Sequence, residues 1–432
     1  LSASEQPEAA FEAWLAAAEA SSRRSAHAEA MSHLHYAEAE LAKLAGTDAT
    51  AQAERHLNLK LASAPVLIAR MGWAAPDVES AYRAALDACD ALDAPPPTRF
   101  EALRGLSNVY LLRGNLRQAK DICEQIYQKA MEAADHSLII DAHRLPGVCS
   151  FLEADFSAAV EHFDTVIQKY EPEKSRTATQ QHGLQPIAIT TAWRAWADWF
   201  QGDYHNVLPR LEEAARLAAG HQFSRAYVLC FMASVAQFDG EAERAAKQGM
   251  AARRVADQYG FAYWQAWADV VTGWARVQLG EPAAGVALLK GGIETYADLG
   301  AAQMHGLWLC LLADAYLRAG EPADARAASE AAIDEVSRTG IRFFLPEAYR
   351  LYGEACAAAP AGGGGGVSEL VRAVRLAHRQ ASPVLLVKAG EAALRHGVGE
   401  PLESCVRQAA SNLRSRPSLS PVIAAAVTRL GG

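Results

Sequence analysis

The sequence predicts an all-α fold, a right-handed α-solenoid of about eight helical hairpins. Hydrophobic residues make up 51% of the 432-residue chain and charged residues 21%, the balance of a folding chain. Alanine, the best helix former, dominates the apolar fraction. Seven short turn signals, centred on residues 72, 114, 154, 202, 240, 280 and 320, recur with a period near 40 residues. Such a period is typical of stacked hairpins, each of which buries its apolar face against its neighbours.

The turn signals share one pattern. A helix ends at Gly or Ala, where a left-handed residue is needed, and an acidic or small polar residue opens the next helix, whose dipole favours negative charge. Pro282 and Pro322 follow in two units, at a first-turn position that requires no N–H. A small residue five positions beyond several turns lets the paired helices approach closely: Ala119, Ala159, Gly285 and Ala325.

These units match the tetratricopeptide pattern, which runs Leu-Gly-x-x-Tyr on the first helix and Ala, Phe and Ala on the second. The best matches are Leu106–Tyr110 with Gly114, Leu116 and Ala119, and Leu312–Tyr316 with Gly320, Ala325 and Ala332. The period near 40 exceeds the usual ~34 residues, so we expect longer helices or turns than in the standard repeat.

The edges of the array are less regular. Residues 1–50 are expected to form N-terminal capping helices (Glu8–Ala20 and Arg24–Leu44), 51–360 the repeat array, and 361–432 a last hairpin and C-terminal capping helices, ending with Pro417–Leu430. Three segments are expected to interrupt this order: a loop or extended segment at Pro95-Pro96-Pro97, a polar break at 171–186, and a flexible glycine loop at Gly362–Gly366.

Composition and motifs argue against several functions. A net charge of -9 without a basic cluster disfavours nucleic-acid binding, and we expect neither a membrane span nor a secretory signal. Seven cysteines without framework spacing indicate buried or half-buried thiols in a reducing cytoplasm. No phosphate-binding loop, zinc spacing or nucleophile motif occurs, and His33 and His35 point to different helix faces. We therefore expect no catalytic residues, metal or cofactor, and a chain that is not an enzyme.

The first helix of each hairpin is expected to line a concave groove. Counting back from the turns places fourteen candidates there: Glu101, Arg104, Asn108, Asp141, Arg144, Trp196, Trp199, Tyr227, Gln237, Trp267, Trp274, Asp314, Arg350 and Glu354. Arg104, Asn108 and Arg144 together have the chemistry to clamp a carboxylate or a peptide backbone. Two alternatives stay open: the tryptophans also suit gaps between hairpins, and the charges also suit a solvated surface.

Four stretches, Glu54–Leu86, Ala188–Asp203, Phe261–Gly280 and Leu307–Gly353, resemble the C-terminal repeat region of large bacterial class III adenylate/guanylate cyclase–ATPase signalling proteins. The resemblance implies an array that binds a protein or peptide partner in its groove and regulates an attached or associated output domain. The alternative is a small-molecule effector-sensing domain of a signal-transduction ATPase or transcriptional activator, with the ligand held near Trp196, Trp199, Trp267 and Trp274. The sequence contains no residues of the cyclase or ATPase domains, so neither activity carries over.

Overall fold

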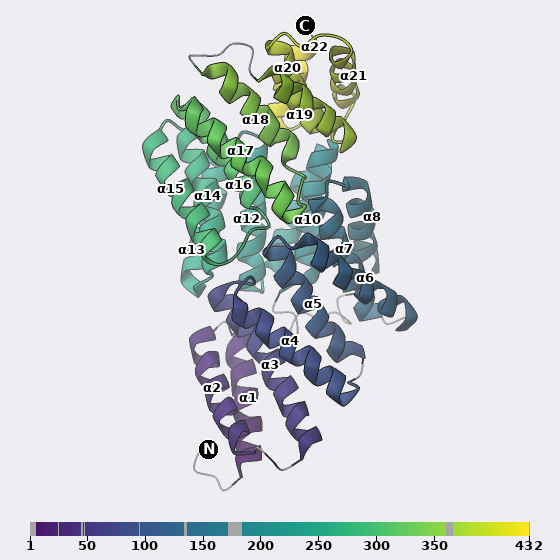
Figure 1. The fold of residues 1–432 in the computed structure, drawn as a ribbon, viewed down its shortest axis with the longest axis vertical. Helices are drawn as coiled ribbons and strands as arrows, with labels where there is room; N and C mark the ends of the chain where they lie inside the picture. The colour runs from purple at the N-terminus through teal and green to yellow at the C-terminus, as the bar shows by residue number, and fades with distance from the viewer. Residues whose placement is uncertain are drawn as a thin grey trace.

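The computed structural model describes residues 6–24, 26–44, 46, 48–94, 96–133, 136–171, 184–359 and 366–431. Within these ranges the chain forms 21 helices and no strand, arranged as an elongated solenoid (Figure 1). The all-α solenoid of tetratricopeptide-like hairpins predicted from the sequence is therefore confirmed.

The N-terminal helices are α1 (Pro7–Arg23) and α2 (His27–Lys43), which pack with α3 (Ala49–Met71) around their own small apolar core. From α3 onwards the helices pair as hairpins, first helix then second: α3 with α4 (Pro76–Leu92), α5 (Pro96–Leu112) with α6 (Leu116–Ala133), α7 (His136–Leu152) with α8 (Phe156–Lys169), α10 (Pro186–Gln201) with α11 (Tyr204–Ala218), α12 (Gln222–Phe238) with α13 (Ala242–Tyr259), α14 (Ala262–Gln278) with α15 (Pro282–Asp298), α16 (His305–Ala319) with α17 (Pro322–Thr339), α18 (Leu345–Ala358) with α19 (Val367–Arg379), and α20 (Pro383–Arg395) with α21 (Leu402–Arg414). A last helix, α22 (Pro421–Gly431), follows.

The described residues thus contain nine hairpins, where about eight were predicted. The ninth, α20 with α21, lies in the stretch 361–432. Its connection contains Gly399-Glu400-Pro401, the same tripeptide that opens α15 and α17, so the sequence did hold a signal for it. Residues 172–183 of the predicted polar break (171–186) and residues 362–365 of the predicted glycine loop lie outside the described residues.

The predicted turn residues adopt left-handed backbone. Gly72, Gly114, Gly202, Gly240, Gly280 and Gly320 have φ between 72° and 94°, and the one non-glycine of the series, Ala154, has φ 65°. Glycines at 260, 300 and 340 end the second helices in the same way. From residue 240 to residue 340 a helix with its turn therefore occupies 20 residues, and the period of 40 is two such units.

One sequence expectation was wrong. Pro96 and Pro97 do not form a loop or extended segment but begin α5. The first N–H groups of a helix have no intrahelical acceptor, and the φ fixed by the pyrrolidine ring is already helical, so proline fits there. Pro95 lies outside the described residues.

Small residues bring the paired helices together, as predicted. Ala119, Ala159 and Ala325 are fully buried. In the hairpin of α14 and α15, a Cβ placed on Gly285 would lie 2.7 Å from both the Gly273 carbonyl oxygen and the Val277 nitrogen. Backbone therefore packs directly on backbone in this hairpin.

The first helices form an inner layer and the second helices an outer one. Every residue of α10 from Pro186 to Phe200 is buried, and α12 and α14 are buried over most of their surface. A helix that is apolar nearly all round belongs in the interior of a packed structure. The inner face of the solenoid is therefore covered along these helices.

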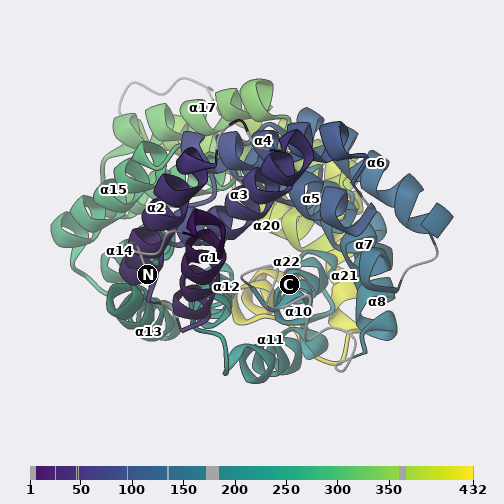
Figure 2. The ribbon, with the colours of Figure 1, turned by 90° about the horizontal axis from the view of Figure 1, so that it is seen from below.

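The next superhelical turn of the same chain bonds to the C-terminal ends of three first helices, α5, α7 and α10. The N–H groups of Ala302 and Gln303 donate to the Leu112 carbonyl (2.7 and 3.0 Å), and the Arg342 N–H donates to the Leu152 carbonyl (2.8 Å). Farther along, the Ser382 hydroxyl donates to the Phe200 carbonyl at 2.7 Å. These pairs lie 182 to 191 residues apart, so the array closes one superhelical turn in that length. Figure 2 shows the helices as a ring around the long axis.

We predict that Gly285→Ala destabilises the protein by ~1–3 kcal/mol, because the added methyl overpacks a backbone-to-backbone contact. Chemical denaturation provides the measurement. The matched control is Gly291→Ala on the same helix, where an added Cβ meets nothing within 4 Å; we expect it to stabilise the protein by about 0.5–1 kcal/mol. Equal effects of the two changes would contradict this description of the hairpin.

Candidate ligand-binding site

The first helices of the C-terminal half converge on one cavity of about 270 Å³. Closure of the superhelix creates it, because α20 packs on α10 and Val422 of α22 lies beside Gly240 at the end of α12. Its walls come from α10, α12, α14, α16, α18, α20 and α22, and include Trp199, Gln237, Trp274, Gln278, Asp314, Glu347, Arg350, Lys388, Glu391 and Arg395. In Figure 2, α22 lies inside the ring near α10 and α12.

A charge network runs along one wall of the cavity. The Glu347 carboxylate accepts from Arg350 (2.7 Å) and Lys388 (3.0 Å). Arg350 also pairs with Glu354, which in turn accepts from Arg395 at 2.8 Å. These ion pairs link α18 to α20 across adjacent hairpins.

The network continues to the last helix. Glu391 of α20 pairs with Arg395 on its own helix at 3.8 Å and with Arg429 of α22 at 2.6 Å. Each of the three glutamates of the network therefore has two basic partners.

Asp314 has a different environment in the same cavity. Its Oδ2 accepts from the Trp274 indole N–H (2.7 Å) and the Gln278 amide (3.1 Å). Among the described residues no Lys, Arg or His reaches its carboxylate within the 4.0 Å of an ion pair. Burial raises the pKa of Asp314 above its ordinary value, although the more distant Arg350 opposes this.

Glu347 shows the opposite shift. Burial alone would raise its pKa, but the charges of Arg350 and Lys388 outweigh burial and hold the pKa well below the ordinary range. Two half-buried carboxyl groups in one cavity therefore differ in pKa because one has cationic partners and the other has neutral donors.

The structure brings five of the fourteen predicted residues to the wall of this cavity: Trp199, Gln237, Trp274, Asp314 and Arg350. Glu354 joins them through its ion pair with Arg350. The indole N–H of Trp199 is already bound, since it donates to Asp239 at 2.8 Å. The indole of Trp199 therefore offers a ligand its ring rather than its N–H.

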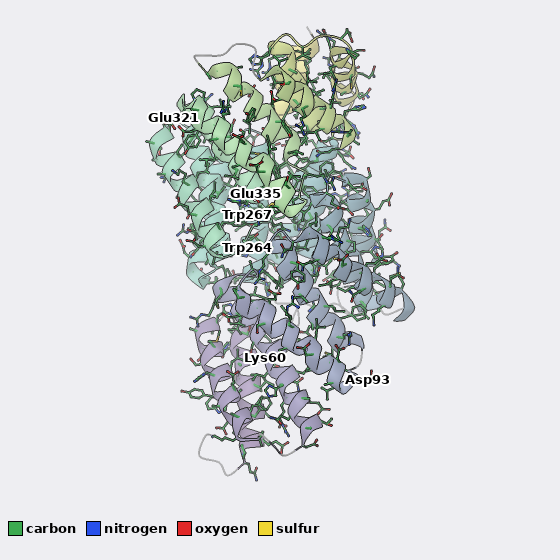
Figure 3. The ribbon with its side chains drawn as sticks, in the orientation of Figure 1. Lys60, Asp93, Trp264, Trp267, Glu321 and Glu335 are labelled. Carbon is green, nitrogen blue, oxygen red and sulfur yellow. The ribbon has the colours of Figure 1, made fainter. Side chains whose placement is uncertain are left out.

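Four others, Asn108, Arg144, Tyr227 and Trp267, line a separate, smaller cavity of about 40 Å³. Trp264 also lines it, and its indole nitrogen has no acceptor among the described residues. Figure 3 shows Trp264 and Trp267 on α14, in the body of the array. A space of this size holds about one water molecule rather than a ligand.

The predicted carboxylate clamp contains an internal carboxylate. Arg104 donates to Asp141 at 3.2 Å and Arg144 donates to the other oxygen of Asp141 at 3.1 Å. Asn108 donates to the Arg104 carbonyl at 2.9 Å. Burial raises the pKa of the neighbouring Glu101, with Arg104 acting against this rise. The two arginines thus hold the chain's own Asp141.

Trp196 does not face a groove. Its side chain is fully buried, stacks on Phe231 with ring centroids 4.2 Å apart, and meets Phe151, Phe238 and Trp267. The inner face at this position is filled by aromatic rings, including those from neighbouring first helices. The interpretation of these tryptophans as gap fillers holds for Trp196.

Five residues of the cavity wall were not predicted from the sequence: Gln278, Glu347, Lys388, Glu391 and Arg395. Three of them, Lys388, Glu391 and Arg395, belong to α20, which was assigned to the C-terminal capping region. Recognising Gly399-Glu400-Pro401 as a hairpin turn would have made α20 a first helix and its residues candidates.

Other functional features are few in the described part of the chain. No cluster of three or more His, Cys, Asp or Glu side chains suited to a metal ion occurs there. None of the described helices combines the length and apolar character that a membrane crossing requires. All seven cysteines are free thiols, five buried and two half-buried, as the sequence predicted.

No protein-family model and no curated protein matches the sequence. Among solved structures the chain is similar to a Rap protein complexed with Competence and Sporulation Factor, with a TM-score of 0.55, 13% identity, and coverage of 88% of this chain and 98% of that one. It also matches the apo form of RapI (TM-score 0.39, 11% identity, 87% and 97% covered). A third match is a signal transduction ATPase with a tetratricopeptide repeat sensor from Pyrococcus horikoshii (TM-score 0.39, 12% identity, 83% and 50% covered). At these identities, the first likeness supports the fold alone.

We predict that Asp314→Asn stabilises the protein at neutral pH, on the order of 1 kcal/mol, because the amide oxygen still accepts both hydrogen bonds and the buried charge is removed. A raised folded-state pKa means that the ionised carboxyl destabilises the fold above that pKa, and that the penalty vanishes below the unfolded value. The gain should therefore shrink as pH falls. Thermal midpoints of both proteins at several pH values test this; a lower midpoint for the variant at neutral pH contradicts it.

Proposed function

We propose that this chain is a non-catalytic tetratricopeptide-type binding module. In the proposal it recognises a peptide, or an extended segment of a protein partner, in the cavity of its C-terminal half. The observation that supports this most directly is the convergence of six first helices and the last helix, α22, on one cavity with indole, amide, carboxylate and cationic walls. Five residues predicted to line a groove meet there although they come from five different helices.

The size of the cavity restricts what can enter. At about 270 Å³ it is close to the lower end of the range of ligand pockets, ~300–1,000 Å³. It accepts one or two side chains of an extended peptide and excludes a folded domain. A small-molecule effector fits the same space, and the two tryptophan rings favour it as the second candidate.

The position of the cavity suits a sensor. Its walls include α10 and α12 on one side and α20 and α22 on the other, and these pairs belong to successive superhelical turns. A ligand that contacts both pairs binds the closed superhelix better than an opened one, and so shifts the population towards closure. Each repeat touches its neighbours, so such a shift changes the curvature of the array.

The proposed output is regulatory. The resemblance of four sequence stretches to repeat regions of cyclase–ATPase signalling proteins supports an attached or associated domain of that type. In this proposal the array supplies recognition, and the chemistry belongs to the other domain.

We expect a peptide selected on the purified protein from a random peptide library to lose affinity at least about tenfold in Gln237→Trp, since the larger ring fills the cavity. Gln125→Trp, the same change on the exposed face of α6, is the control and should keep the affinity. Fluorescence anisotropy of the labelled peptide gives both dissociation constants. Selected peptides that bind the two variants equally well would contradict the assignment of the cavity. If only dialysable metabolites bind the protein, the small-molecule candidate is favoured.

We also expect the selected ligand to slow hydrogen exchange at the amides of Ala302, Gln303 and Arg342, which bond across the superhelical turns. At about 100 times its Kd a ligand stabilises the binding form by ~2.7 kcal/mol, so exchange through opening should slow by about a hundredfold. Amides of α1 and α2, which have a separate core, serve as the internal control. Unchanged exchange across the turns at saturation would contradict a sensor that acts through closure.

A further inference from the structure

The cavity contains one carboxylate whose charge is not neutralised locally. Arg350, Lys388 and Arg395, the basic residues of the wall, are each bound to glutamates. Asp314 receives two neutral donors, both on Oδ2. Among the described residues no hydrogen-bond donor reaches its Oδ1. An ionised carboxylate accepts about four hydrogen bonds, so Asp314 retains capacity on the side of the cavity.

The side chain remains accessible from the cavity. Asp314 is half-buried and lies in the wall. Trp274 and Gln278 donate from α14, one first helix away, which fixes Oδ2, while Oδ1 has no donor among the described residues. The site is thus built before any ligand arrives.

The surrounding groups select for an organic cation. An anion would have to compete with the glutamates for Arg350, Lys388 and Arg395. A metal ion would need several oxygen or nitrogen ligands, and no cluster of three or more such acidic, histidine or cysteine side chains occurs among the described residues. The rings of Trp199 and Trp274 line the same cavity, and indole faces attract ammonium and guanidinium groups.

Building on the proposed function, we propose that Asp314 is the subsite for one ammonium or guanidinium group of the ligand, that is, a lysine, arginine or terminal amine. The cation donates to Oδ1 and lies against the tryptophan rings, with Gln237 and Gln278 available to its remaining donors. This pairing neutralises the carboxylate that the fold leaves without a cationic partner. Charge-assisted hydrogen bonds are about twice as strong as neutral ones, so the subsite should dominate selectivity.

The test uses probes that differ only in charge. N-acetyl-arginine amide and its uncharged isostere N-acetyl-citrulline amide are titrated into the full chain, followed by tryptophan fluorescence and calorimetry. We expect the wild-type protein to prefer the arginine probe by about tenfold or more. Asp314→Asn should remove that preference, with a thermal midpoint no lower than that of the wild-type protein.

The matched control is Asp239→Asn. Asp239 is also a buried aspartate that accepts from an indole N–H, that of Trp199, but it pairs with Arg244 and does not line the cavity. This variant should keep the preference for arginine. If Asp314→Asn keeps the preference, or if wild-type protein binds both probes equally or neither, the cation subsite is overturned.

These outcomes are separable from the proposed function. If a library peptide binds through the Gln237 wall but is indifferent to Asp314→Asn, the proposed function is supported and the cation subsite is contradicted. If the protein binds the arginine probe selectively but no peptide ligand is found, the cation subsite is supported and the small-molecule candidate is favoured.

Discussion

The structure depends on the contact between successive superhelical turns. Helices of about 17 residues are ~25 Å long. Successive superhelical turns meet edge to edge, and N–H groups that follow one hairpin donate to carbonyls of a hairpin in the preceding turn. The bonds from Ala302 and Gln303 to Leu112, and from Arg342 to Leu152, repeat this contact at an interval of 40 residues along the chain. The helices that flank these bonds have nearly equal lengths, 17 residues in α5, α7 and α15 and 18 in α17. Much longer or shorter hairpins there would bring the two edges out of contact.

Closure of the superhelix changes its inner surface from a solvent-filled groove to a packed interior. In an open solenoid the first helices line a solvent-filled groove, whereas here α10, α12 and α14 are covered and aromatic rings fill the space between them. Phe343, which follows the second helix α17, reaches Phe151 of α7 and Phe200 of α10 across the superhelical turn. What remains of the groove is the cavity where α20 and α22 return beside α10 and α12. In the proposed function, binding at that place is coupled to the closure of the array.

Local sequence patterns predicted the fold class, the left-handed turn residues, including Ala154, and the small residues between paired helices. These features depend on residues at most about 20 positions apart. Periodicity also indicated which helix of each hairpin faces inward, so Trp199, Trp274 and Asp314 were found. It could not show that Trp196 would be covered, or that Asp141 would lie between Arg104 and Arg144, since these depend on packing between separate helices. Lys388 and Glu391 were missed because their hairpin was not recognised as a repeat.

A comparison of Asp314 with Glu347 distinguishes a residue that stabilises the fold from one proposed to bind the ligand. Both carboxyl groups lie in the same cavity, yet Arg350 and Lys388 satisfy one, while neutral N–H groups alone bind the other. An asparagine at position 314 would make the same two hydrogen bonds without a buried charge, so stability alone does not favour aspartate there. A charge that costs stability in a preformed cavity is typical of a site that expects an opposite charge from a ligand. A cation bound there would contribute its binding energy where the two superhelical turns meet, and recognition would then stabilise closure directly.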